Sequence, residues 1–292
     1  MRTIVAGLAS HIATSRTRLS RCIRLDLRDG TSIGVTDHDS DLEVNLGDGA
    51  LSYSADIGLT AASIKHSLGL SADSLELSGP IADPFTRTAV AGGRFTQARV
   101  RVFDVRWDSP TQYLRLMAGK ITAATVSGGQ FTFEARSKVD AYNQVIGRVL
   151  APQCSHEFGV DNGLTSRCQA TPQVWAATVT AVTDDMHFEV SWGSPAPDEA
   201  ADALNGLVEF TSGELAGTYP VEVFSLSGSP LDTIETYQPL IEAPQVGDSL
   251  TVTEGCDKLR TTCKLKGQIL NFGGFPDLVG TDAYVKFPAP GG

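Results

Sequence analysis

Four of the five cysteines in this sequence fall in two pairs, and they are the residues best suited to chemistry. Thirteen residues separate Cys154 from Cys168, and six separate Cys256 from Cys263. Four thiols that meet in one place can form two disulfides, bind a structural zinc ion or hold an iron–sulfur cluster. Cys22 stands alone in the polar phase of its strand and has no partner in the sequence.

Spacing and compartment do not decide among these chemistries. Zinc sites usually contain a ligand pair separated by about two to four residues, which weakens zinc here without excluding it. Disulfides need an oxidising compartment, whereas the N-terminal residues fit an amphipathic helix better than a secretory signal. The apolar face of that helix would consist of Ile4, Val5, Leu8 and Ile12. Disulfides, zinc, a cluster and four unrelated buried thiols therefore stay open.

The surroundings of the second pair favour a site for thiolates. The basic residues Lys258, Arg260, Lys264 and Lys266 would favour the thiolate form and offset its charge. Gly273 and Gly274 can bring backbone amides close to sulfur atoms, although a tight surface turn explains the same glycines. His156, near the first pair, could donate to a ligand or replace one, or be an ordinary loop histidine.

The elements that must position the cysteines are mainly β-strands with short helices. Apolar residues alternate from Ile23 to Leu27 and from Ile33 to Val35, and the Asp29–Gly30 turn signal between them predicts a half-buried strand pair. A change of phase after Val102 predicts a bulged strand. We therefore expect a β-rich first domain over residues 1–148, with a helix from Lys138 to Val149 at its end.

The segment between the two cysteine pairs has an all-β pattern whose spacing suits a small barrel or sandwich. Its candidate strands are 175–183, 187–192, 207–210, 221–224 and 234–237. The simplest topology inserts this β domain, residues 172–250, into a Cys-rich domain. That domain consists of residues 149–171 and 251–292, so its two halves would bring all four thiols together.

Composition excludes several classes of protein. At 292 residues the chain is long enough for two or three domains, and its 41% hydrophobic content is typical of folded proteins. A net charge of -11 argues against stable nucleic-acid binding, because that binding relies on Lys and Arg displacing counterions. DNA could still pass along an acidic wall without binding to it. No window reaches the roughly 18 apolar residues of a membrane span.

Other motifs give little support for a site. Asp37, Asp39, Asp41 and Asp48 are spaced as in a calcium loop, but Leu42 occupies the position of the turn glycine, and an aspartate replaces the bidentate glutamate. The sequence contains no Gly-x-Ser-x-Gly, phosphate-binding loop, dinucleotide fingerprint or His-Glu-x-x-His. No motif thus supports a hydrolase or a nucleotide-binding enzyme, and we expect no catalysis.

The second cysteine pair carries a family resemblance. The runs Gly255–Cys263 and Leu270–Pro276 resemble the C-terminal signature of phage tail hub proteins, including the minor tail protein L of lambda-like phages. The likeness is closer to the tail hub protein of gene transfer agents and related siphophages. The runs Val35–Leu42, Leu68–Leu75 and Val208–Tyr219 are similar to elements of that subfamily, so the resemblance covers nearly the whole chain.

The resemblance implies a structural protein of the virion tail tip. It implies a tail-tube-like β domain and an iron–sulfur cluster, of the 4Fe–4S type, held by Cys154, Cys168, Cys256 and Cys263, with zinc as the alternative. The first pair matches the family only in order. The resemblance also implies a homotrimer, assembled in the bacterial cytoplasm, that joins the tail tube to the central, fibre-like tip protein. The distal tail and tape-measure proteins would be partners, and DNA would pass through without specific binding.

Two rival functions use the same residues differently. An iron–sulfur or zinc enzyme would need an open metal site and a second pocket, and such enzymes usually group their cysteines more tightly. A carbohydrate-binding module for host attachment would need an exposed platform formed by Trp175, Trp192 and Tyr219. Both tryptophans lie in apolar strands, which favours core packing over a platform.

Overall fold

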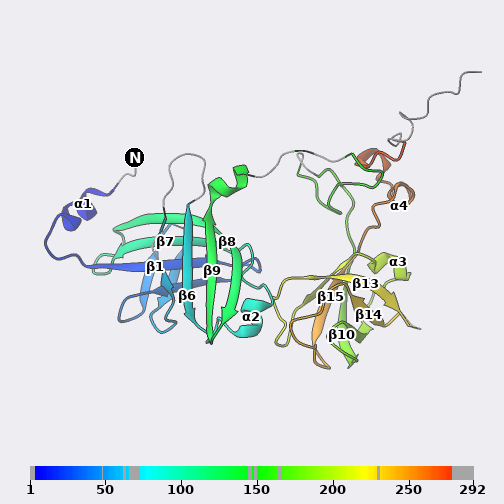
Figure 1. The fold of residues 1–292 in the computed structure, drawn as a ribbon, viewed down its shortest axis with the longest axis horizontal. Coiled ribbons are helices and arrows are strands. Elements are labelled where there is room, and N and C mark those ends of the chain that lie inside the picture. The colour runs from blue at the N-terminus through cyan, green and yellow to red at the C-terminus, as the bar shows by residue number, and fades with distance from the viewer. Residues whose placement is uncertain are drawn as a thin grey trace, which may run out of the picture. The chain divides into compact units, whose positions relative to one another are not determined.

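In the computed structural model the chain forms two units, one made of Met1–Gln144 and Glu214–Tyr219 and the other of Val145–Gly213 and Pro220–Gly292 (Figure 1). The structure describes residues 4–47, 49–61, 64–65, 73–143, 147, 150–162, 166–228 and 231–277. Asp48, most of the Leu68–Leu75 run and much of residues 144–149 lie outside them, as does the C-terminal end from residue 278. The predicted division into three domains stays a prediction.

The first unit is a sheet with short helices. Its elements are α1 (Ala6–Ile12), β1 (Leu19–Asp26), β2 (Ser32–Thr36), β3 (Leu42–Asn45), β4 (Ala50–Ser54), β5 (Thr60–Ala61), β6 (Ser74–Pro80), α2 (Arg87–Ala91), β7 (Arg99–Arg106), β8 (Tyr113–Ser127), β9 (Gln130–Ser137) and the 3-10 turn η1 (Lys138–Asn143). The strand order within the described residues is β3-β4-β2-β1-β7-β8-β9-β6-β5. Neighbouring strands are antiparallel, except that β2 and β4 are parallel.

The described strands of this sheet form an open order, and their direction changes along β8 around a core of aromatic side chains (Figure 1). The first half of β8 pairs with β7 and the second half with β9, and its register shifts between Ile121 and Ala123. Figure 1 shows β7 crossing β9 at a steep angle as a result. The enclosed rings of Phe85, Phe95, Phe131 and Phe133 are fully buried. Phe85 and Phe131 lie 4.7 Å apart between ring centroids, a spacing that favours tilted aromatic pairs.

Two local predictions in this unit are confirmed. The chain turns between β1 and β2 at Asp29–Gly30, where Gly30 has a φ of 86° and the Asp29 carboxylate accepts a hydrogen bond from the amide of Thr31. The predicted bulge lies between Val102 and Phe103 in β7. Both features depend only on nearby residues, so the turn residues and the change in apolar alternation were enough to predict them.

The prediction that β1 is half-buried and that Cys22 lies on its polar side is wrong. The exposed fraction of Cys22 is 0%, and the polar residues Ser20 and Arg24 on the same strand are also buried. A second apolar cluster covers this face of β1 and includes Cys22, Val44, Leu46, Tyr53, Phe103 and Val105. Strands β3 and β4 supply part of that cover, and their position could not be read from β1 itself.

The second unit contains a closed barrel followed by short helices. Its elements are β10 (Val174–Val182), β11 (His187–Trp192), α3 (Ala200–Ala203), β12 (Leu207–Phe210), β13 (Val221–Ser227), β14 (Thr233–Thr236), β15 (Ser249–Thr253), α4 (Arg260–Leu265) and the 3-10 turn η2 (Ile269–Asn271). The barrel order is β10-β11-β14-β13-β12-β15. The five predicted strands are confirmed, and β15 carries the barrel past the predicted end at residue 250.

The chain enters and leaves the barrel at one point. Strands β10 and β15 are antiparallel neighbours, with Val174 opposite Thr253. Just outside them, the amide of Glu254 donates to the carbonyl of Gln173 at 2.8 Å, and the amide of Gln173 donates to the Glu254 carboxylate at 2.9 Å. Closing the barrel therefore brings the segments that carry the two cysteine pairs next to each other.

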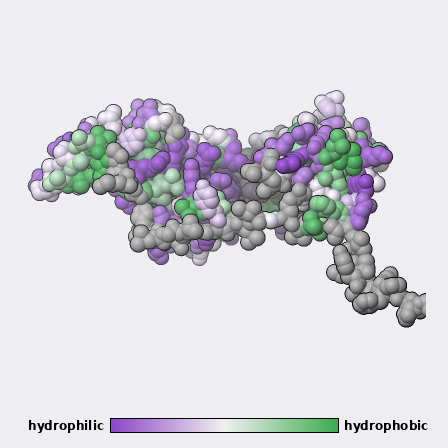
Figure 2. All heavy atoms as spheres, turned by 90° about the horizontal axis from the view of Figure 1, so that it is seen from above, coloured by the Kyte–Doolittle hydropathy of each residue, from purple (hydrophilic) through white to green (hydrophobic). Residues whose placement is uncertain are grey.

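One face of the molecule is mostly polar (Figure 2). Hydrophilic residues predominate on the face shown in Figure 2, where hydrophobic residues form separate patches. In the part of the chain that the structure describes, no helix combines the length and apolar character needed to cross a membrane.

Candidate functional site

The four paired cysteines line one small pocket in the second unit. Cys154 and Cys168 lie on loops, Cys256 follows β15, and Cys263 is in α4. The structure thus brings together the four residues that the sequence singled out. All five cysteines of the chain, each within the described residues, are free thiols, so the disulfide alternative gains no support.

Lys258 ties the two cysteine-bearing loops together. Its amide lies 3.4 Å from the sulfur of Cys256, its carbonyl accepts a hydrogen bond from the amide of Cys154 at 2.9 Å, and its ammonium donates to the carbonyl of His156 at 2.8 Å. The residue has a φ of 61°, which is uncommon for a side chain larger than glycine. This strained backbone lets one residue contact both loops.

The double glycine brings the following backbone against the first loop. The amide of Gly273 lies 3.3 Å from the sulfur of Cys154, as predicted for a glycine near a sulfur ligand. A Cβ on Gly274 would lie 2.5 Å from the carbonyl oxygen of Pro152, so only glycine fits there. The amide of Phe275 then donates to the carbonyl of Ala151 at 2.8 Å.

His156 is a buried residue of the pocket rather than a solvated loop histidine. Its exposed fraction is 6%, and its Nδ1 lies 2.9 Å from the carbonyl oxygen of Asn271. The tautomer that donates from Nδ1 leaves Nε2 as an acceptor. His156 therefore links the first loop to η2 through its ring and to Lys258 through its own carbonyl.

Burial and the nearby cations have opposite effects on the pKa of the pocket thiols. Burial raises the pKa of Cys256, while the amide and charge of Lys258 and the charge of Lys266 act to lower it. Burial also raises the pKa of Cys263, as does the proximity of the other three paired thiols. Lys266 forms an ion pair with Glu254 and lies over the ring of Phe158. Four thiolates here would repel one another unless a cation neutralised them.

The thiols suit a metal centre in type, but their present spacing does not suit a single ion. Tetrahedral zinc would place its sulfur ligands about 3.8 Å apart, from a zinc–sulfur distance of about 2.3 Å. Within the described residues, no group of three His, Cys, Asp or Glu side chains is placed to hold one metal ion. The cavity between the thiols is about 20 Å³, room for about one water-sized sphere. A cluster is larger than one water molecule, so it would need more room between the thiols than this cavity has.

The remaining candidate sites have structural explanations. The Asp37 carboxylate accepts hydrogen bonds from the hydroxyl of Ser20 and the amide of Arg21, each at 2.6 Å, so it braces a strand end. The exposed fraction of Trp175 is 2%, which excludes it from a carbohydrate platform. Tyr219 belongs to the first unit, where the guanidinium of Arg28 lies 5.1 Å from its ring centroid.

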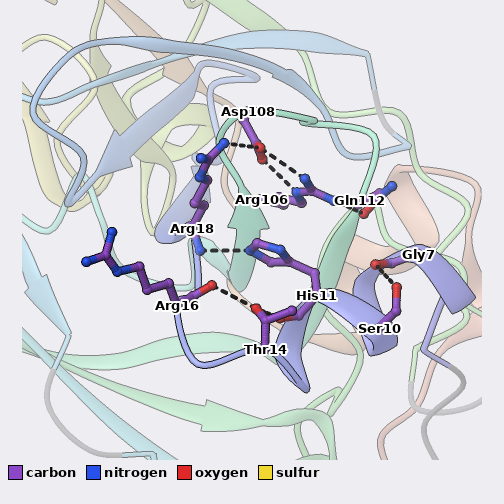
Figure 3. A network of polar contacts seen from close by, with 9 residues as sticks. All are labelled: Gly7, Ser10, His11, Thr14, Arg16, Arg18, Arg106, Asp108 and Gln112. Carbon is purple, nitrogen blue, oxygen red and sulfur yellow. Dashed lines mark hydrogen bonds and ion pairs between the residues drawn. The ribbon is translucent and has the colours of Figure 1, made fainter.

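A polar network that the sequence analysis missed anchors the N-terminal helix (Figure 3). The Nε2 of His11 in α1 accepts a hydrogen bond from the amide of Arg18 at 2.8 Å. The carboxylate of Asp108 accepts a hydrogen bond from the guanidinium of Arg18 at 3.1 Å and two more from the guanidinium of Arg106. The bonds from Arg106, and then that from Arg18, lower the pKa of Asp108 to about 2. These polar contacts therefore hold the C-terminal end of α1. Ile4, Val5 and Ile12 are exposed, and Leu8 is buried.

Comparisons with known proteins give this architecture a family. Residues 5–170 match the family described as baseplate hub protein, N-terminal attachment domain, and residues 204–282 match phage conserved hypothetical protein BR0599. A chain in the solved structure of the virion of a native gene transfer agent particle is 28% identical, with a TM-score of 0.79. The match covers 99% of this chain and 97% of that one. None of the curated proteins matches. The first family spans more than half of the sequence, so the chain belongs to the baseplate hub proteins of phage-like tails.

Proposed function

We propose that this hub protein joins the tail tube to the central tip protein as a homotrimer. The strongest support is the match to a gene transfer agent virion chain over nearly the full length of both chains. Helix α1 supports the proposal, because Ile12 at its end and Ile4 and Val5 just before it are exposed apolar residues that a partner would cover. The distal tail, tape-measure and tip proteins are the proposed partners, and assembly takes place in the bacterial cytoplasm.

Entry into tail particles tests this role. We expect the purified chain to associate into a ring by light scattering, and to appear at the tip of tails when its partners are present. A chain that stays monomeric with its partners and never enters a tail particle would remove the assignment.

We also propose that Cys154, Cys168, Cys256 and Cys263 hold an iron–sulfur cluster, with zinc as the alternative. The observation that carries this proposal is the lack of an apolar core around the pocket. Among the described residues of 150–170 and 254–277, no hydrophobic side chain is buried, and Leu265 and Leu270 are 88% and 96% exposed. A segment without a core needs a metal or disulfides to fold.

The chain's own residues would hold and shield such a centre. A cluster would supply four strong bonds to thiolate sulfur and a compact cross-link between two distant segments. The amides of Lys258 and Gly273 point at the sulfurs of Cys256 and Cys154, where they stabilise the thiolate form. Lys258 and Lys266 offset the negative charge.

The Cys263→Ser variant tests the ligand assignment. A hydroxyl is a hard, poorly ionised ligand, so we expect the metal to be lost and stability to fall by roughly several kcal/mol. The measurements are iron, sulfide and zinc content, visible absorbance and thermal melting of protein purified without oxygen. Cys22→Ser is the control and should keep its metal. Equal metal content in Cys263→Ser and unmodified protein would exclude the assignment, whereas zinc in place of iron would exclude only the cluster.

A further inference from the structure

A row of positive charges crosses the sheet of the first unit. Arg99 in β7 lies opposite Lys120 in β8, and Lys120 lies opposite Arg136 in β9. All three side chains are exposed. Like charges directly opposite on neighbouring strands destabilise a sheet. An arrangement that costs the fold stability indicates a role outside the fold.

The row lines a groove of about 590 Å³ that collects further cations. Arg101, Arg115 and Lys138 line it as well, beside Tyr142, which is 80% exposed. Two carboxylates moderate the charge, since Asp26 pairs with Arg101 at 2.5 Å and Asp140 lies 3.4 Å from Arg136. We call this surface the basic groove.

Several cations of the basic groove have no partner in the part of the chain that the structure describes. No described residue forms a hydrogen bond or ion pair with the side chain of Arg99, Arg115 or Lys138. Arginine and tyrosine are also the residues enriched at the centres of protein interfaces. The groove therefore has the composition of an interface that receives a negatively charged partner.

The same chain carries the complementary charge. Residues 168–257, which include the whole barrel, contain 15 Asp and Glu and no Lys or Arg. The other residues hold all 23 Lys and Arg against the remaining 19 of the 34 acidic residues. The exposed acidic side chains are spread over the barrel, including Glu189 in β11 and Glu222 in β13. The net charge of -11 hides this separation.

We propose that the basic groove of one copy receives the acidic barrel of a second copy. The barrel lies in the longest stretch of the sequence that carries acidic residues and no Lys or Arg. A contact between two different surfaces of identical chains is heterologous, and heterologous contacts close into rings when the rotation allows. Nucleic acid fits the groove less well, because each copy also carries the strongly acidic barrel, which repels phosphate. The inference deepens the proposed ring and rests on it.

A charge-swap experiment on the full chain tests the contact. The groove-reversed variant is Arg99→Glu/Lys120→Glu, and the barrel-reversed variant is Glu189→Lys/Glu222→Lys. We expect the unmodified chain to assemble in sedimentation at low salt and to dissociate at high salt, where charges are screened. Each variant alone should stay monomeric. The fourfold variant, with both surfaces reversed, should assemble again.

Mixing the two variants gives a sharper result. The intact barrel of the groove-reversed copy can meet the intact groove of the barrel-reversed copy, and the reversed groove and reversed barrel of the same two copies also carry opposite charges. An equimolar mixture should therefore associate, whereas neither variant does so alone. Thermal melting of each variant shows that it is folded, so loss of assembly is not loss of structure.

Three results would overturn the inference. An unmodified chain that is monomeric at low salt would mean that the groove and barrel do not meet between copies. A mass unaffected by either reversal would place the contact elsewhere. Binding of a short DNA duplex that the groove reversal abolishes, with assembly unchanged, would assign the groove to nucleic acid. Entry of the unmodified chain into tails is measured separately, so the hub role can hold when this contact fails.

Discussion

At the scale of single residues, the sequence located the candidate site but not its geometry. Residue type and spacing picked out the cysteine pairs, and the structure places all four around one pocket. The part of Lys258 could not be foreseen, because it depends on a positive φ and on contacts with residues about 100 positions away. The burial of Cys22 was equally hidden, since strands from elsewhere in the chain cover it.

Cys22 makes the fold sensitive to alkaline pH. Burial raises the pKa of its thiol from 9.0 to about 11. The folded state therefore keeps a proton that the unfolded state loses, so stability is retained below pH 9 and lost as the pH rises towards 11. Between about pH 8 and pH 10.5 the free energy of unfolding should fall by about 2 kcal/mol more than in Cys22→Ala. Urea unfolding at the two pH values measures the difference, and equal falls in both proteins would contradict it.

The ammonium of Lys258 is expected to stabilise the pocket. Lys258→Met removes its hydrogen bond to the carbonyl of His156 and should cost about 1–2 kcal/mol of unfolding free energy. Metal should also pass more quickly to a chelator. Lys264→Met is the matched control, because it removes a charge from the same segment without removing a side-chain contact to a described residue. Equal losses in the two variants would mean that charge alone matters.

At the scale of elements, alternation predicted individual strands better than their pairing. The five strands between the cysteine pairs lie where expected, yet most of β15 fell in the predicted Cys-rich part because the predicted β segment ended at residue 250. The order of the first sheet, in which β1 pairs with β7 and β6 with β9, depends on contacts distant in sequence. Periodicity carries no information about such partners.

The barrel should be removable without loss of the pocket formed by the four cysteines, or of the metal proposed for it. Joining Gln173 to Glu254 through a short glycine linker keeps all four cysteines and bridges a gap already closed by two hydrogen bonds. The deletion removes the bonds from Asn205 to the carbonyl of Cys256 and from the amide of Gly255 to Asp202, so the pocket should lose about 1–2 kcal/mol of stability. It also removes residues 214–219, which belong to the first unit, so melting of that unit is measured separately. Metal content per chain measures the outcome. Metal loss at every linker length would show that the barrel is part of the pocket.

At the scale of the whole molecule, the sequence predicted the family and concealed the distribution of charge. The motifs around the second cysteine pair led to the tail hub proteins, which the comparisons confirm. The net charge argued correctly against a generally basic surface, but a single sum cannot show that acidic residues dominate one segment and basic residues another.

The row of positive charges in the basic groove should lower the stability of the isolated chain and favour its self-association. Lys120→Glu places a carboxylate between Arg99 and Arg136, so two repulsive pairs become attractive, and the isolated chain should gain about 0.5–2 kcal/mol. The same change should weaken self-association. Lys138→Glu is the control, because it lowers the charge of the groove outside the row and should weaken association without the gain. Thermal melting and sedimentation separate the two effects, and a destabilised Lys120→Glu chain would contradict the repulsion.

The adjacent ends of the barrel also impose an order on biosynthesis. Cys263 follows Cys168 by 95 residues, and at about 5–20 residues per second a ribosome needs roughly 5–20 s to reach it. The barrel strands all precede Glu254, so the barrel can close as the late cysteines leave the ribosome, and its closure carries them to the early ones. Until then Cys154 and Cys168 sit on a nascent chain as exposed thiols. A cell that makes this protein must keep them reduced while the other half of their pocket is still being translated.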